Sequence, residues 1–172
     1  MDSPSLTSTM KDILSKENYS DLTISCQGRD FKVHRAIVCY HSSFFRNALK
    51  GGFKDDVDSP EPKPKTHKSG TVAYNNLQVY MAADKFDIPL LRTLASTRLI
   101  RWVLSHYKSQ EFPDVVQEIL RTIPPHENII RTFITKIIIE NVPLFLAHEK
   151  GQGVLINNPN LTVDILKAVV NR

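Results

Sequence analysis

The spacing of the apolar residues changes at His34, and this change constrains the fold more than any other feature of the sequence. Before His34, apolar and polar residues alternate over residues 20–26 and again over 29–34, which predicts two half-buried strands. Gln27 and Gly28 between them are typical of a tight turn, so the pair is expected to form a β-hairpin. After His34 the apolar residues follow helical spacing. A small hairpin followed by helices is therefore predicted.

Two short helices are predicted directly after the hairpin. The first begins at the change of spacing, and Ser42 or Ser43 can cap the second, which Gly51 and Gly52 end. We expect the large apolar side chains of these helices to form core: Ile37, Tyr40, Phe44 and Phe45.

A short amphipathic helix is predicted before the hairpin, within residues 5–18. Its apolar residues, Leu6, Met10, Ile13 and Leu14, form one narrow stripe at helical spacing. A helix of about three turns is not stable alone in water. The stripe is therefore expected to lie against another surface.

The remainder of the chain divides into one loop and a series of helices. Residues 54–71 hold few apolar residues and several prolines, which predicts an exposed loop. From Val72 the pattern is helical, with a new helix starting near Pro89, and the architecture is α+β or mostly α. The later helices are predicted over about 114–122, 127–141 and 143–149, with a last helix capped by Asn160 or Thr162.

Composition excludes several classes of function. The net charge of +4 is spread along the chain, and the densest basic stretch, residues 62–68, is short, so direct nucleic-acid binding is not expected. The most apolar stretch, 129–147, is interrupted by charges and by Pro143, so no membrane span is expected. The N-terminal residues lack the pattern of a secretory signal. An intracellular location, cytoplasmic or nuclear, with reduced cysteines is therefore expected.

His34, Cys39 and His41 are the candidate residues for metal or nucleophilic chemistry. They span the change from strand to helix, and their spacing matches no metal-binding pattern. Cys26 and Cys39 are expected to lie in the core, where cysteines are common. No catalytic residue, metal or cofactor is therefore expected, and a small metal-dependent hydrolase built on these residues is the alternative from another class.

Polar and charged residues lie at the start of the first strand of the hairpin and just after the end of the second. Asp21 begins the first strand, and His34 and Arg35 follow the end of the second. Antiparallel pairing places these ends opposite each other, within reach of an ion pair. The pair is either a structural salt bridge at a sheet edge or part of a charged, partner-binding surface.

Two stretches resemble one known family in the right order. Residues 20–56, SDLTISCQGRDFKVHRAIVCYHSSFFRNALKGGFKDD, are similar to the opening of a BTB/POZ domain, with its His-Arg strand end and Ser-x-Phe-Phe helix. Residues 79–95, VYMAADKFDIPLLRTLA, resemble the later helix pair of that family. The arrangement of a short N-terminal helix before this region and a helical extension after it is most similar to that of stand-alone BTB proteins of filamentous fungi. The family has a third strand and a helix where this chain has only the loop before Val72, which either a shortened gene product or a trimmed domain would explain.

The resemblance implies a fold class and a domain organisation. The fold is expected to be α+β and BTB/POZ-like, with the N-terminal helix and hairpin packed on a helical cluster. The BTB/POZ-like domain is expected over residues 1–108, and an all-α extension over 109–172.

The resemblance also implies a non-enzymatic protein-interaction module. Members of the family form homodimers through the N-terminal helix and first strand, and their charged-pocket positions correspond to Asp21, His34 and Arg35. The partners implied are a second copy of the chain, a cullin scaffold or a transcriptional partner. With a cullin scaffold, the chain would be a substrate adaptor of a ubiquitin ligase. The corresponding dimer positions here are Leu6, Met10, Ile13, Leu14 and Leu22.

Overall fold

The chain forms two compact units in the computed structural model, which describes residues 5–26, 28–51, 72–124 and 128–171. Unit 1 comprises Met1–Glu61 and Lys85–Pro89, and unit 2 comprises Pro62–Asp84 and Leu90–Arg172. The predicted loop over 54–71 lies outside the described residues. The units are defined by contacts, so the domain limits 1–108 and 109–172 stay predictions.

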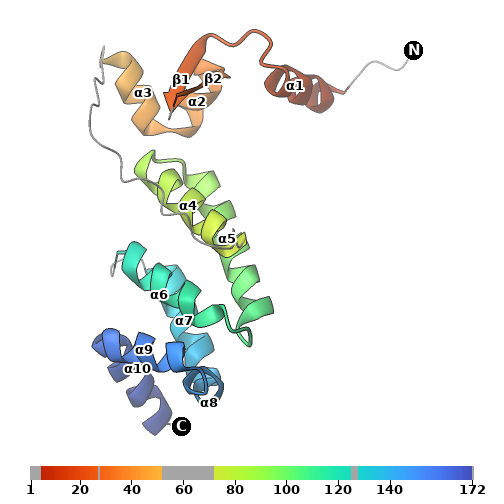
Figure 1. The fold of residues 1–172 in the computed structure, drawn as a ribbon. Helices are drawn as coiled ribbons and strands as arrows, with labels where there is room; N and C mark the ends of the chain where they lie inside the picture. The colour runs from red at the N-terminus through yellow and green to blue at the C-terminus, as the bar shows by residue number, and fades with distance from the viewer. Residues whose placement is uncertain (1–4, 27, 52–71, 125–127, 172) are drawn as a thin grey trace. The chain divides into compact units, whose positions relative to one another are not determined.

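Unit 1 contains the predicted N-terminal helix and hairpin (Figure 1). The antiparallel strands pair from Leu22 opposite Val33 to Cys26 opposite Arg29. Gly28 lies in the turn with a φ of +72°, a conformation that glycine adopts without steric cost. The hairpin prediction is therefore confirmed. The elements are α1 (Leu6–Ser15), β1 (Leu22–Cys26), β2 (Arg29–Val33), α2 (Arg35–His41) and α3 (Ser43–Lys50).

Ser42 is the N-cap of α3, as its position in the sequence predicts. Its hydroxyl oxygen accepts the Phe45 backbone N–H at 3.1 Å, and the hydroxyl donates to the Phe86 carbonyl at 2.5 Å. Gly51 is the C-cap of the same helix. Ser42 therefore both begins α3 and joins it to the turn over 85–89.

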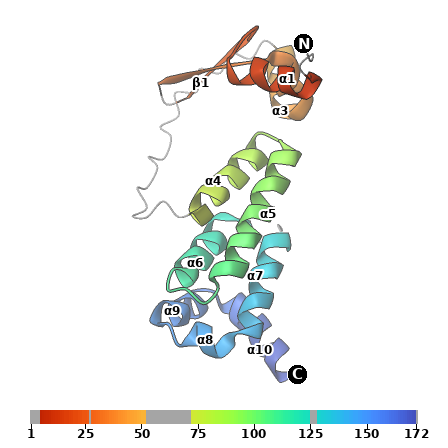
Figure 2. The same cartoon turned by 90° about the vertical axis from the view of Figure 1, so that its right-hand side faces the viewer.

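Unit 2 is helical throughout its described residues. In both ribbon views α4 and α5 lie side by side and antiparallel, and α6 to α10 form a cluster of shorter helices (Figures 1 and 2). This agrees with the all-α extension predicted from the sequence. The helices are α4 (Val72–Lys85), α5 (Pro89–His106), α6 (Phe112–Thr122), α7 (Asn128–Glu140), α8 (Val142–Leu146), α9 (Glu149–Asn157) and α10 (Pro159–Val170).

Two details at the C-terminal end differ from prediction. Helix α9 was not predicted, because Gly151 and Gly153 lower helix propensity. Helix α10 has its N-cap at Asn158, before both of the predicted caps, Asn160 and Thr162. Pro159 follows at the first helical position, where its missing N–H costs no intrahelical hydrogen bond.

The hydrophobic core lies in unit 2. Every apolar side chain that is buried among the described residues belongs to this unit, and Ser42 is the one buried residue described in unit 1. The core joins α4 and α5 to the cluster of shorter helices. Its largest fully buried side chains are Leu77, Leu99, Phe112, Ile119, Ile123, Ile134 and Ile138.

The predicted core of α2 and α3 is wrong. Tyr40 is 79% exposed and Phe44 is 40% exposed, while Ile37 and Phe45 are half-buried. A two-stranded hairpin and two short helices offer too little apolar surface to cover these side chains. Large apolar groups therefore remain on the surface of unit 1.

One arginine joins two helices of unit 2. The Arg131 guanidinium of α7 donates to the Leu120 carbonyl at 2.5 Å and to the Ile123 carbonyl at 2.5 and 2.9 Å. These carbonyls end α6 and lack partners within that helix. Burial lowers the pKa of Arg131.

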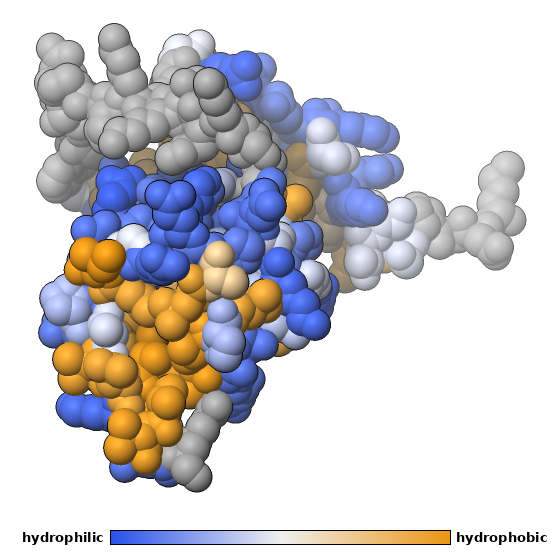
Figure 3. Space-filling model, turned by 60° about the horizontal axis from the view of Figure 1, so that its bottom comes forward, coloured by the Kyte–Doolittle hydropathy of each residue, from blue (hydrophilic) through white to orange (hydrophobic). Residues whose placement is uncertain are grey.

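Exposed apolar residues also gather at the C-terminal end of unit 2 (Figure 3). Helix α10 contributes Val163, Leu166, Val169 and Val170. None of the described helices is long and apolar enough to cross a membrane.

Candidate partner-binding surface

The apolar stripe of α1 is exposed. Ser5 caps the helix by accepting the Ser8 N–H at 3.2 Å, which fixes its start and thereby the direction of the stripe. Leu6, Met10 and Leu14 are 78%, 43% and 46% exposed and line one shallow hollow along the helix. The predicted stripe is therefore present, and no described residue buries it.

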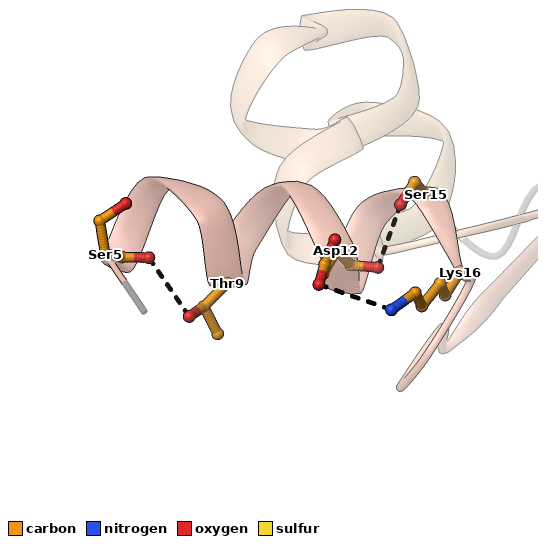
Figure 4. Close-up of polar contacts among 5 residues, drawn as sticks. All are labelled: Ser5, Thr9, Asp12, Ser15 and Lys16. Carbon is orange, nitrogen blue, oxygen red and sulfur yellow. Dashed lines mark hydrogen bonds and ion pairs between the residues drawn. The ribbon is translucent and has the colours of Figure 1, made fainter. Parts of the chain in front are cut away.

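Several polar side chains of α1 find partners within the helix (Figure 4). The Thr9 hydroxyl donates to the Ser5 carbonyl at 3.3 Å, and the Ser15 hydroxyl donates to the Asp12 carbonyl at 3.3 Å. Lys16 Nζ lies 3.5 Å from Asp12 Oδ2 in an exposed i,i+4 pair, which contributes little to stability. The face of α1 that still lacks a partner is the apolar one.

Two of the other predicted dimer residues are partly covered. Ile13 on α1 is half-buried, and Leu22, the first residue of β1, is half-buried beside its strand partner Val33. Ile13 lies three residues after Met10 on α1, and neither Ile13 nor Leu22 is buried enough to be core.

Asp21 and Arg35 meet, but through the backbone. Asp21 Oδ1 accepts the Arg35 backbone N–H at 2.7 Å, which is a charge-assisted hydrogen bond at the N-terminus of α2. The Arg35 guanidinium donates to the Leu49 carbonyl at 3.4 Å instead of pairing with Asp21. The predicted proximity is present, and the carboxylate takes the place of a side-chain cap that His34 does not supply.

His34 serves the same junction. Its Nε2 lies 2.7 Å from the Asn18 carbonyl, so the segment before β1 is joined to the residue before α2. Asp21, His34 and Arg35 thus hold the hairpin to α2, and their role in partner binding stays a prediction.

The cysteines and histidines do not form a cluster. Cys26 is exposed and Cys39 is half-buried, so the prediction that both lie in the core is wrong. Among its described residues, unit 1 has no second sheet or long helix that would cover the hairpin and form a deep core to receive them. No group of three or more His, Cys, Asp or Glu side chains in the described part of the chain could hold a metal ion.

Exposed aromatic side chains add to this surface, and the sequence did not identify them as surface. Tyr19, Phe31 and Tyr40 are exposed. Phe44 lies edge-to-face with Phe86 at a centroid distance of 5.3 Å, so one of its faces is covered. The lack of a further apolar strand in the sequence after α3 was the available signal that these rings would stay uncovered.

Comparison with known proteins identifies this region. The family model of the BTB/POZ domain matches residues 10–69. The chain is 40% identical over 47 residues to Kelch repeat and BTB domain-containing protein 4 of Macaca fascicularis, and 39% identical over 46 residues to the proteins of that name from Pongo abelii and Homo sapiens. Each match covers 27% of this chain and 9% of the relative. The predicted family is therefore confirmed for one segment: residues 10–69 are a BTB/POZ domain, a protein–protein interaction module.

Proposed function

We propose that this chain is a non-enzymatic protein-interaction module that self-associates through the apolar stripe of α1. The observation that carries the proposal is the exposure of Leu6, Met10 and Leu14 in one stripe of a capped helix. BTB domains homodimerise and bind partners such as cullins. An uncovered stripe within such a domain is explained by a second copy that covers it.

The energetics favour an interface that extends beyond α1. Fully burying a leucine or methionine side chain gains about 1.5–3 kcal/mol. The three exposed side chains of each of two copies would then gain at most about 9–18 kcal/mol. Association costs an estimated 4–15 kcal/mol, so α1 alone is close to balance. We therefore include Ile13 of α1 and Leu22 of β1 in the proposed interface, as the family resemblance implies.

Light scattering on purified protein at micromolar concentration tests the proposal. The wild type should be a dimer, and Met10→Asp should be monomeric, because a charge in the stripe would be buried without a partner. Met10 is exposed within one copy, so the substitution should leave the fold of the copy intact.

Ser8→Asp, at an exposed position of α1 that is neither three nor four residues from Met10, Ile13 or Leu14, is the matched control and should remain dimeric. A monomeric wild type, or equal dissociation of both variants, would refute the proposed interface.

A role as substrate adaptor of a cullin-type ubiquitin ligase is the second candidate. The relatives are named for a BTB domain combined with Kelch repeats, which favours an adaptor in which one segment docks and another recruits. The resemblance associates cullin docking with a third strand and helix of the family, in whose place this chain is expected to have only the loop over 54–71, outside the described residues. A pull-down with a purified cullin N-terminal domain tests docking, and an empty pull-down counts against it.

The finer assignments follow from the same resemblance. We propose a stand-alone BTB protein of the filamentous-fungal type, shortened between Phe53 and Val72, that acts inside the cell and recruits a cullin or a transcriptional partner. A transcript that encodes an in-frame strand and helix at this point would show that the shortening arises from the gene product.

A further inference from the structure

Unit 2 contains a basic hollow between α4 and α5 that is separate from the α1 stripe. Its volume is about 440 Å³. Asn76 lines it from α4, and the α5 side is formed by Arg98, Arg101, Trp102, Ser105 and His106.

The two arginines of the hollow are uncompensated. Arg98 and Arg101 lie three residues apart on α5, so their side chains emerge from the same face. Neither guanidinium makes an ion pair or a hydrogen bond within the described residues, whereas the guanidinium of Arg92 on the same helix pairs with Asp84 at 2.9 Å. No acidic residue is among the described residues that line the hollow. It therefore presents positive charge without a counter-charge.

Asn76 supplies an unused hydrogen-bond donor. Its side chain is buried, with 8% of the residue exposed, and its Nδ2 has no hydrogen-bond partner among the described residues. A buried amide without a partner is unfavourable and requires an explanation. An acceptor oxygen that enters the hollow would provide one.

Trp102 and His106 fix the rim of the hollow. Their rings stack in parallel, with centroids 4.6 Å apart and an interplanar angle of 1°. His106 Nδ1 lies 2.9 Å from the Trp102 carbonyl, which orients the imidazole and leaves Nε2 without a described contact. The hollow thus combines two guanidinium groups, an amide donor and an oriented imidazole.

We propose that this hollow binds a phosphate group, as a phosphomonoester dianion. Guanidinium groups bind phosphate oxygens through paired N–H donors, and a dianion matches the two uncompensated charges. The Asn76 amide donates to a remaining oxygen. The phosphate belongs either to a small molecule or to a phosphorylated side chain of a partner, and the chemistry of recognition is the same. This site is independent of self-association through α1.

Titration calorimetry on the full chain, with chloride as the only other anion, tests the proposal. The probes are inorganic phosphate, a phosphoserine peptide and the same peptide without phosphate. Saturable 1:1 binding of inorganic phosphate or of the phosphopeptide is expected, and the unphosphorylated peptide should not bind. Tighter binding of the phosphopeptide would identify a phosphorylated partner, and tighter binding of inorganic phosphate would identify a small molecule.

Substitutions locate the binding. Arg98→Gln with Arg101→Gln should weaken phosphate binding by at least about tenfold. Arg29→Gln with Lys32→Gln removes the same charge from exposed positions of β2 and should bind as the wild type does. Asn76→Leu should weaken binding while the protein stays folded, because it also removes the unpaired amide.

Absence of saturable binding would overturn the proposal. Equal binding by the Arg98/Arg101 variant and the wild type would overturn it too, as would equal losses in that variant and the Arg29/Lys32 control. The single tryptophan lies in the hollow, so its fluorescence reports independently on whether each variant remains folded there.

Discussion

Substituting alanine for Gly151 tests how closely α8 and α9 pack. A Cβ built at Gly151 would lie 2.0 Å from the Phe145 carbonyl oxygen, far inside contact distance. A Cβ built at Gly153, two residues later in α9, would meet no atom within 4 Å. The same substitution at these two glycines therefore differs in one respect, the clash with α8.

The magnitude follows from comparing the two variants. Alanine is favoured over glycine in a helix by about 1 kcal/mol, and both variants gain this amount. Overpacking costs about 1–3 kcal/mol, and it applies at Gly151 alone. Gly153→Ala should therefore raise the free energy of unfolding by up to about 1 kcal/mol. Gly151→Ala should fall below Gly153→Ala by about 1–3 kcal/mol.

Urea unfolding followed by the fluorescence of Trp102 measures both values. Trp102 is buried in unit 2, so its emission reports on the unit that contains α8 and α9. The midpoints should shift in opposite directions, or Gly151→Ala should lie clearly below Gly153→Ala. Equal shifts in the two variants would refute the close approach of α9 to the Phe145 carbonyl.

Two further predictions concern charge in unit 2. Arg131→Met should lower the free energy of unfolding by about 1.5–3 kcal/mol, because the carbonyls of Leu120 and Ile123 lose a charged donor. Lys136→Met, at an exposed position of α7, is the control and should change the free energy of unfolding little. Urea unfolding of both variants measures the difference. Burial and neighbouring carboxylates raise the pKa of Tyr74 above its ordinary value of 10.0, so the folded state holds that proton more tightly than the unfolded chain. Stability should therefore decline as the pH rises above about 10, and Tyr74→Phe should make that decline less steep in unfolding curves measured at several pH values.

Features that depend on neighbours in the sequence were predictable. Ser42 caps α3 because its hydroxyl lies three residues before a backbone N–H that has no partner within the helix. Gly28 allows the hairpin turn because glycine adopts a positive φ without steric cost. Helix α9 was not predicted because glycine at position 151 has low helix propensity. The structure shows another reason for this glycine: the contact with α8 requires a residue without a Cβ. Tertiary packing, which the local pattern does not contain, decided the second case.

The candidate surface was predictable in position but not in detail. Helical spacing predicts the apolar stripe that contains Met10 and Leu14. The exposure of the stripe depends on whether other parts of the chain pack against it, which the spacing does not show. The spacing of Asp21 and Arg35 predicts their proximity, but the backbone N–H at a helix start competes with the guanidinium for the carboxylate. The spacing around Tyr40 correctly predicts a helix, but the predicted burial of Tyr40 is wrong. An apolar helix face does not show whether another element packs against it.

The two units differ in how much apolar surface their described residues bury. Unit 2 holds the buried apolar side chains of the described chain, so its stability is internal. Unit 1 contains the described part of the BTB/POZ match yet buries no apolar side chain among its described residues, so a bound partner would supply much of the burial that it lacks. A ligand that binds only the folded state stabilises it by RT ln(1 + [L]/Kd), where [L] is the free ligand concentration. Self-association through α1 should therefore stabilise unit 1 as protein concentration rises, whereas phosphate in the α4–α5 hollow should stabilise unit 2 at any concentration of the chain.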